Sequence, residues 1–236
     1  MILPYSVYVY LAAAVGPAAL LMWLVYRHDN KDREPAYLLR KLLLGGLFAA
    51  VIAFILETVG ENLMYLLLGN LSLSTAQFGL LNAVMVGFAE EFAKFRYLKK
   101  YTWNDPNFNY RYDALLYAVF VSLGFAAVEN ILYIFMYGLT VAVPRALLAI
   151  PAHLAFSVFM GVFYGRAKIC GTHGDETGRR INSLAAYLFP VALHSIYDGI
   201  LMSKGSMILF YVFVIAVDIA VFVRIRYESS HDVSIY

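Results

Sequence analysis

The chain has 236 residues, of which 62% are hydrophobic and 14% are charged, and its formal net charge is +2. Soluble domains carry about 25% charged residues, so this composition excludes an ordinary soluble enzyme and indicates a polytopic membrane protein. The single cysteine, Cys170, excludes an intrachain disulfide and lies in a predicted loop.

Seven apolar segments approach or exceed the roughly 20 residues that a helix needs to cross a hydrocarbon core of about 30 Å. They cover about residues 5–26, 37–57, 77–98, 112–137, 144–166, 181–202 and 207–225. We therefore expect an all-α bundle of about seven transmembrane helices that forms one integral membrane domain over residues 1–236. Residues 63–68 are either a continuation of the second helix or an interfacial segment.

Lysine and arginine residues predict the orientation of the bundle. They concentrate near residues 27–41, 96–111, 166–180 and 224–226, whereas the alternate loops hold only Arg145 and Lys204. Because positively charged loops stay in the cytoplasm, we expect the N-terminus outside and the C-terminus inside the cell membrane.

Three charged residues, Glu90, Glu91 and Lys94, interrupt the third apolar segment. A charge at the centre of a spanning helix costs about 2.5–3.5 kcal/mol, while each leucine, isoleucine or valine returns only about 0.3–0.6 kcal/mol. These side chains must therefore face protein or water. The Glu-to-Lys spacing of four residues assigns Lys94 to Glu90 and leaves Glu91 for another task, although either carboxylate can reach it. An ion pair that only fixes helix packing is the structural alternative.

Further polar residues fall on the later predicted helices, namely Glu129, Asn130, His153, His194 and Asp198. His194 and Asp198 are four residues apart, so the carboxylate can orient the imidazole. We expect the helices to converge so that the glutamates and both histidines line one water-accessible cavity, since none can face lipid cheaply. For Glu129, a structural polar stripe on its helix is the alternative.

Two hydrolytic chemistries fit these residues. In the first, a glutamate, Glu91 by preference, activates water, while both histidines and Asn130 stabilise an oxyanion. In the second, His153, His194 and a carboxylate bind Zn²⁺. The chain contains neither His-Glu-x-x-His nor Gly-x-Ser-x-Gly, so we favour glutamate-activated water, with no obligatory cofactor, over zinc.

Four motifs follow one another along the chain: Glu90-Glu91-x-x-Lys94, the run 122–133 with Glu129-Asn130, Pro151-Ala152-His153, and His194-x-x-x-Asp198. In this order they resemble the PrsW family of intramembrane proteases over nearly the whole chain. That family is distantly similar to the CAAX prenyl endopeptidases and the bacterial CPBP-type membrane proteases, in which the cation comes one residue later. The resemblance implies site-1 cleavage of a single-span membrane protein such as an anti-sigma factor. The expected surroundings are the lipid bilayer, with no nucleic acid.

The depths of these residues in their helices predict where the substrate is cut. At 1.5 Å per residue, His153 lies roughly 13 Å below the outer end of its helix, and His194 lies about 20 Å above its cytoplasmic end. Glu129 lies at a similar level, and Glu91 lies at or slightly below the midplane. We therefore expect cleavage at or just outside the outer membrane boundary. Arg145 is expected to anchor to lipid headgroups or to steer an acidic substrate segment.

Three other classes of protein are alternatives. A proton- or ion-coupled transporter would use the buried acids and histidines as a relay, but the two halves show no inverted repeat of broken helices. A seven-helix photoreceptor would need a Schiff-base lysine in residues 207–225, which contain none. A membrane scaffold would require the glutamates to be dispensable.

Overall fold

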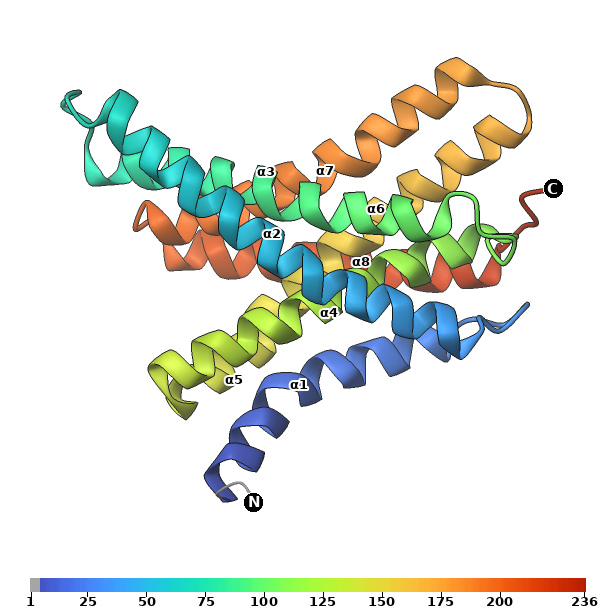
Figure 1. Ribbon diagram of the computed structural model, residues 1–236, viewed down its shortest axis with the longest axis horizontal. Coiled ribbons are helices and arrows are strands. Elements are labelled where there is room, and N and C mark those ends of the chain that lie inside the picture. Colours follow the sequence, from blue (N-terminus) through green and yellow to red (C-terminus); the bar gives the residue numbers. More distant parts are fainter. Residues whose placement is uncertain (1–4) are drawn as a thin grey trace.

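The structure is a computed structural model that describes residues 5–236, so the first four residues of the predicted domain lie outside it. Its helices are α1 (Tyr5–Tyr26), α2 (Ala36–Leu68), α3 (Thr75–Thr102), α4 (Arg111–Tyr137), α5 (Ala142–Pro144), α6 (Ile150–Thr172), α7 (Glu176–Met202) and α8 (Met207–Ser230) (Figure 1). A 3-10 turn, Leu139–Val141, and a π-helical turn, Arg145–Ala149, flank α5. The described residues form no β-strand, which confirms the all-α prediction.

The seven long helices match the seven predicted segments, and several of them extend beyond the apolar runs. The segment predicted to start at residue 144 begins with the end of α5 and the π-helical turn, and α6 itself starts at Ile150. Helix α2 continues through residues 63–68, which therefore prolong the second helix. The polar stretch 166–180, predicted as a loop, is mostly helical, and Cys170 lies within α6 rather than in a loop. The Asp175 carboxylate caps α7 by accepting from the backbone N–H of Gly178 at 2.8 Å. A helix can thus continue through polar residues beyond the hydrocarbon core, because water and capping side chains can form hydrogen bonds with its polar groups there.

Six of the long helices, all except α3, are long and apolar enough to cross a membrane. Helix α3 carries the three charges of the third apolar segment and packs between α2 and α7, so these charges face protein rather than lipid. The loops rich in lysine and arginine lie at the same end of the bundle as the C-terminus (Figure 1). By the positive-inside rule we expect this end to be cytoplasmic. The loops at the opposite end, which we call the outer end, follow α2, α4 and α7.

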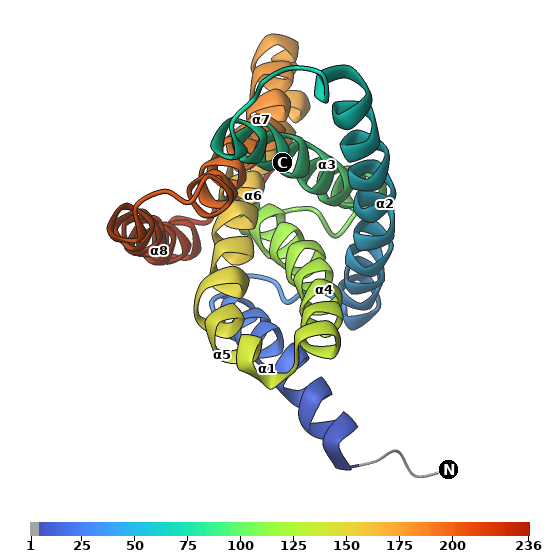
Figure 2. The ribbon, with the colours of Figure 1, turned by 90° about the vertical axis from the view of Figure 1, so that its left-hand side faces the viewer.

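Helix α4 is the central helix of the bundle. Residues 112–126 are all buried, as expected for a helix that is apolar on every side. Helices α1, α2 and α6 pack around it. Figure 2, in which the outer end faces the viewer, shows α4 enclosed by its neighbours and α8 standing apart from them.

Two glycines bring neighbouring helices to backbone distance from α4. A Cβ atom added at Gly46 of α2 would lie 2.2 Å from the carbonyl oxygen of Val121, and one added at Gly161 of α6 would lie 2.4 Å from Cα of Leu115. Helices α2 and α4 cross at the Gly46 contact and diverge toward the outer end (Figure 1). The glycines therefore close the cytoplasmic half of the bundle and leave space between the helices in the outer half.

We expect Gly161→Ala to destabilise the protein by about 1–3 kcal/mol, because the new methyl group must displace the backbone of α4. Gly16→Ala in α1 is the matched control, since a Cβ atom there meets nothing within 4 Å. Thermal unfolding in detergent measures both variants. Equal unfolding temperatures for the two would contradict the close contact between α4 and α6.

Two carboxyl groups are buried at the cytoplasmic end, in the loop between α1 and α2. Asp29 is 5% exposed and Glu34 is 4% exposed. The Tyr117 hydroxyl donates a hydrogen bond to Oε2 of Glu34 at 2.6 Å. Burial raises the pKa of Asp29 from 3.8 to about 6 and the pKa of Glu34 from 4.5 to about 7.

These raised pKa values make the stability of the fold depend on pH. The unfolded chain loses the Glu34 proton near pH 4.5, whereas the folded chain keeps it until about pH 7, so stability falls as the pH rises through this window. For Glu34 the loss is about 3 kcal/mol at most. We expect Glu34→Gln, which keeps an acceptor for Tyr117, to flatten the pH dependence of thermal unfolding. An unchanged slope would assign that dependence to other groups.

Candidate active site

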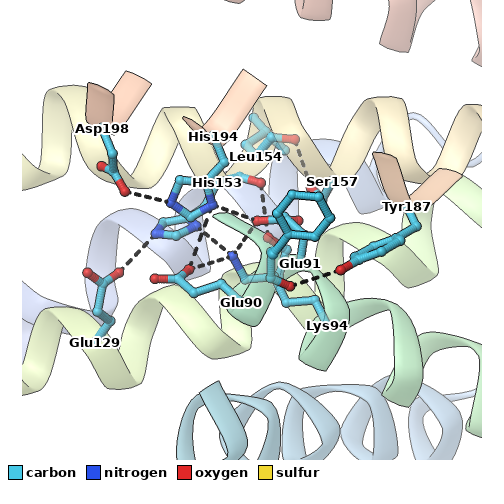
Figure 3. Close-up of polar contacts among 12 residues, drawn as sticks. Glu90, Glu91, Lys94, Glu129, His153, Leu154, Ser157, Tyr187, His194 and Asp198 are labelled. Carbon is cyan, nitrogen blue, oxygen red and sulfur yellow. Dashed lines mark hydrogen bonds and ion pairs between the residues drawn. The ribbon is translucent and has the colours of Figure 1, made fainter. Parts of the chain in front are cut away.

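The polar residues of α3, α4, α6 and α7 meet inside the bundle, and Lys94 lies at their centre (Figure 3). Its Nζ atom donates to Oε2 of Glu90 at 2.9 Å and to Oε1 of Glu91 at 2.8 Å, and lies 3.1 Å from Nδ1 of His153. An ammonium group has three N–H donors, so these three acceptors satisfy it completely. The assignment of Lys94 to Glu90 alone is therefore corrected, because both carboxylates of the helix turn toward it.

The contacts of His153 determine its tautomer. Since Nδ1 accepts from the Lys94 ammonium, the ring hydrogen is on Nε2, which donates to Oε2 of Glu129 at 2.9 Å. Nη2 of Arg145 lies 3.0 Å from the same carboxylate oxygen. Glu129 is therefore held between an imidazole and a guanidinium, and His153 is held between an ammonium and a carboxylate.

His194 lies between two carboxylates. Its Nδ1 atom is 2.9 Å from Oε1 of Glu91, and its Nε2 atom is 3.3 Å from Oδ2 of Asp198. Ionised carboxylates only accept hydrogen bonds, so only an imidazolium with hydrogen on both nitrogens can donate to both. Asp198 thus orients His194 as its spacing on α7 predicted.

Asn130 lies beside the site without entering it. Its side-chain amide donates to the backbone carbonyl of Ala14 at 3.0 Å, and its Oδ1 atom accepts from Nε of Arg145 at 2.5 Å. Asn130 is 0% exposed, so its second amide hydrogen is not presented to an oxyanion either. Asn130 therefore links α1 to α4 and orients Arg145, in place of the oxyanion contact that we expected.

Arg145 turns into the protein rather than toward lipid headgroups. The expectation that it steers an acidic substrate segment stays a prediction. Its guanidinium is paired with Glu129 and lies 3.9 Å from the centre of the Tyr133 ring. A charge pair away from bulk water gains more than a contact between a cation and the solvated headgroups. A sequence signal was present, because an arginine on the outer side departs from the positive-inside pattern.

A cavity of about 670 Å³ connects these residues with the outer end of the bundle. The predicted site residues that line it are Glu90, Glu129, His153, His194 and Asp198. Its deepest lining residues on α3, α4, α6 and α7 are Glu90, Phe125, Phe156 and His194, and the lining extends from this level to the outer ends of the helices. Glu91 is 0% exposed and does not line the cavity.

The sequence interpretation missed two acidic residues of α2, Glu57 and Glu61, which line the same cavity. Glu57 lies within an apolar run, where a carboxylate has the same insertion cost as the glutamates of α3. Among the described residues, Glu57 has neither an ion pair nor a side-chain hydrogen bond within the usual distances. The cost of a charge in a spanning segment was the signal that could have identified it.

The fit of this centre to a metal ion depends on Lys94. Glu90, Glu91 and His153 each offer a ligand atom, and these atoms lie within 4.8 Å of one another, as in a site for zinc. However, Nζ of Lys94 lies within 3.1 Å of the same three side chains. The histidine pair proposed as zinc ligands also has all four ring nitrogens in contact with other side chains. The residues as arranged therefore do not fit a metal ion.

The sequence model of one protein family, described as "PrsW family intramembrane metalloprotease", matches residues 34–223. The chain belongs to the PrsW family. "Protease PrsW" of Geobacillus kaustophilus (strain HTA426) is 34% identical over 195 residues, which cover 82% of this chain and 80% of that protein. "Protease PrsW" of Bacillus subtilis (strain 168) is 30% identical over 204 residues, which cover 84% and 85% of the two chains. No solved structure matches the chain.

Membership in the PrsW family confirms the resemblance found in the sequence. It shows that the chain is an intramembrane protease, and the helices agree with a multi-pass protein of the cell membrane. The transporter, photoreceptor and scaffold alternatives are therefore set aside. The polar network in Figure 3 is the candidate active site of this PrsW protease.

We expect Glu91→Gln to destabilise the protein more than Glu90→Gln. Glu91 is fully buried between Lys94 and His194, and breaking a buried ion pair costs about 3–5 kcal/mol. Glu90 borders the cavity, where water can replace part of the lost contact. Thermal unfolding of both variants in one detergent is the measurement, and a larger loss for Glu90→Gln would contradict the different burial of the two carboxylates.

Proposed function

We propose that this PrsW protease hydrolyses a peptide bond of a single-span membrane protein with water activated by Glu90, and that it needs no metal ion for this step. The proposal rests on the different surroundings of the two carboxylate oxygens of Glu90. Oε2 is fixed by the Lys94 ammonium at 2.9 Å, while the carboxylate borders the cavity that reaches the outer end. A positioned carboxylate in contact with water has the arrangement of a general base.

The geometry favours Glu90 over Glu91, the base chosen from spacing alone. Oε1 of Glu91 is shared by Lys94 and His194, and the whole side chain is sealed from the cavity. Among the described residues, no hydrogen bond to Oε1 of Glu90 is present, so this oxygen can accept a proton from water. Glu91 then serves to hold Lys94 and the His194 imidazolium in place.

The reaction that these residues support is a two-step hydrolysis. Glu90 takes a proton from water as the water oxygen bonds to the carbonyl carbon of the scissile peptide, which gives a tetrahedral oxyanion. Protonated Glu90 then gives the proton to the amide nitrogen as the carbon–nitrogen bond breaks, and the base is restored. Positive charge for the oxyanion is available from the His194 imidazolium and the Arg145 guanidinium, which line the same cavity.

The position of the cavity supports a cut near the outer surface of the membrane. Its lining reaches Glu61 on α2, Tyr137 on α4 and Met202 on α7, which lie near the outer ends of these helices. An extended segment just outside the hydrophobic span of a substrate can reach the centre from this side. A single-span protein such as an anti-sigma factor, the substrate implied by the sequence resemblance, has one such segment.

The test uses the full chain in lipid vesicles with a tagged single-span protein, and mass spectrometry of the products. We expect Glu90→Gln to lower the cleavage rate by about 10²–10⁴-fold, because the amide cannot accept the proton. The unfolding temperature of this variant should stay within a few degrees of the wild type. Full activity of Glu90→Gln would show that Glu90 is not the general base. A cut on the cytoplasmic side of the membrane would refute cleavage near the outer surface.

A further inference from the structure

The Lys94 ammonium occupies the position that a metal ion would take in this centre. Three side chains direct an acceptor atom at Nζ from 2.8 to 3.1 Å, and the same three side chains form the cluster capable of holding a metal ion. The Phe125 ring closes the remaining side, with its centre 4.1 Å from Nζ. The lysine is 0% exposed, so its charge has no path to solvent.

We propose that the Lys94 ammonium replaces a metal ion at this centre, and that its removal converts Glu90, Glu91 and His153 into a zinc site. The donor set, two carboxylates and one imidazole, is one that zinc accepts, and one of its members, Glu90, also borders the cavity through which an ion could enter. In the wild type, a divalent ion would have to share this space with a buried cation. The electrostatic repulsion between them excludes the metal.

This substitution of an ammonium for a metal has a chemical consequence, which rests on the proposed function. A metal ion binds water directly and lowers the pKa of that water. An ammonium group can only donate hydrogen bonds, and Glu90, Glu91 and His153 accept all three of those that Lys94 can donate. Lys94 is therefore a positioning residue. It holds one oxygen of Glu90, neutralises Glu91, and keeps the hydrogen of His153 on Nε2, so the nucleophilic water must come from the cavity.

The test measures zinc per chain in the full-length protein, purified without a histidine tag, equilibrated with Zn²⁺ and desalted. We expect less than about 0.1 zinc per chain in the wild type and about one in Lys94→Ala. The variant Lys94→Ala/His153→Ala should lose the ion, and Lys94→Arg, which keeps the positive charge, should bind none. With Co²⁺ in place of Zn²⁺, visible absorption bands of a tetrahedral ion should appear in Lys94→Ala and not in the wild type.

Stoichiometric zinc in the wild type that is lost in His153→Ala would overturn the proposal, as would a folded Lys94→Ala protein that binds none. If Lys94→Ala does not fold, Lys94→Cys replaces it, because the thiol is uncharged without metal and releases its proton to bind zinc as a thiolate. One zinc per chain in that variant supports the proposal, and none overturns it. Metal content does not depend on turnover, so failure of the Glu90 mechanism and failure of this proposal are distinguishable.

Discussion

The structure depends on one buried ammonium group. Without Lys94, two carboxylates of α3 would lie side by side in a protein interior surrounded by lipid, where unpaired charges are most costly. With it, the two glutamates and the histidine of α6 have a common partner, and the contacts continue through His194 to α7 and through Glu129 to α4. The polar contacts therefore add to the close glycine contacts in fixing the register of the helices that carry these residues.

The same interaction explains why α3 can be part of a membrane protein although its composition does not meet the criterion for a span. The charged side chains contact Phe125 of α4, His153 of α6 and His194 of α7, so they face protein and not lipid. Small residues such as Ala89 and Ala93 lie beside the charges and are buried, which allows the neighbouring backbones to come close. Insertion of α3 is thus a property of the assembled bundle and not of the segment alone.

The sequence predicted the fold class and the long helices, because apolar length acts locally. The side of the membrane on which each end of the bundle lies stays a prediction. The sequence also predicted which polar residues turn inward, since the cost of exposing them to lipid applies wherever they lie. It did not predict that Glu90 lines the cavity while Glu91 is fully buried. Adjacent residues on a helix point about 100° apart, and only the packing of α6 and α7 decides which of them is covered. The inward turn of Arg145 likewise depends on Glu129, a residue of another helix.

The glycine-packed crossing of α2 and α4 has an electrical consequence. Below the level of Glu90 and His194 the bundle is closed around α4, so the cavity that reaches the opposite end of the bundle ends at the candidate active site. In a membrane, voltage falls across the part that excludes water and ions, which here is the packed cytoplasmic half. With the orientation that the lysine and arginine pattern predicts, the candidate site would be close to the potential of the external solution although it lies deep within the bundle. A substrate segment that enters from the outer side, as we propose, would bring its charges to the site with little work against the membrane field.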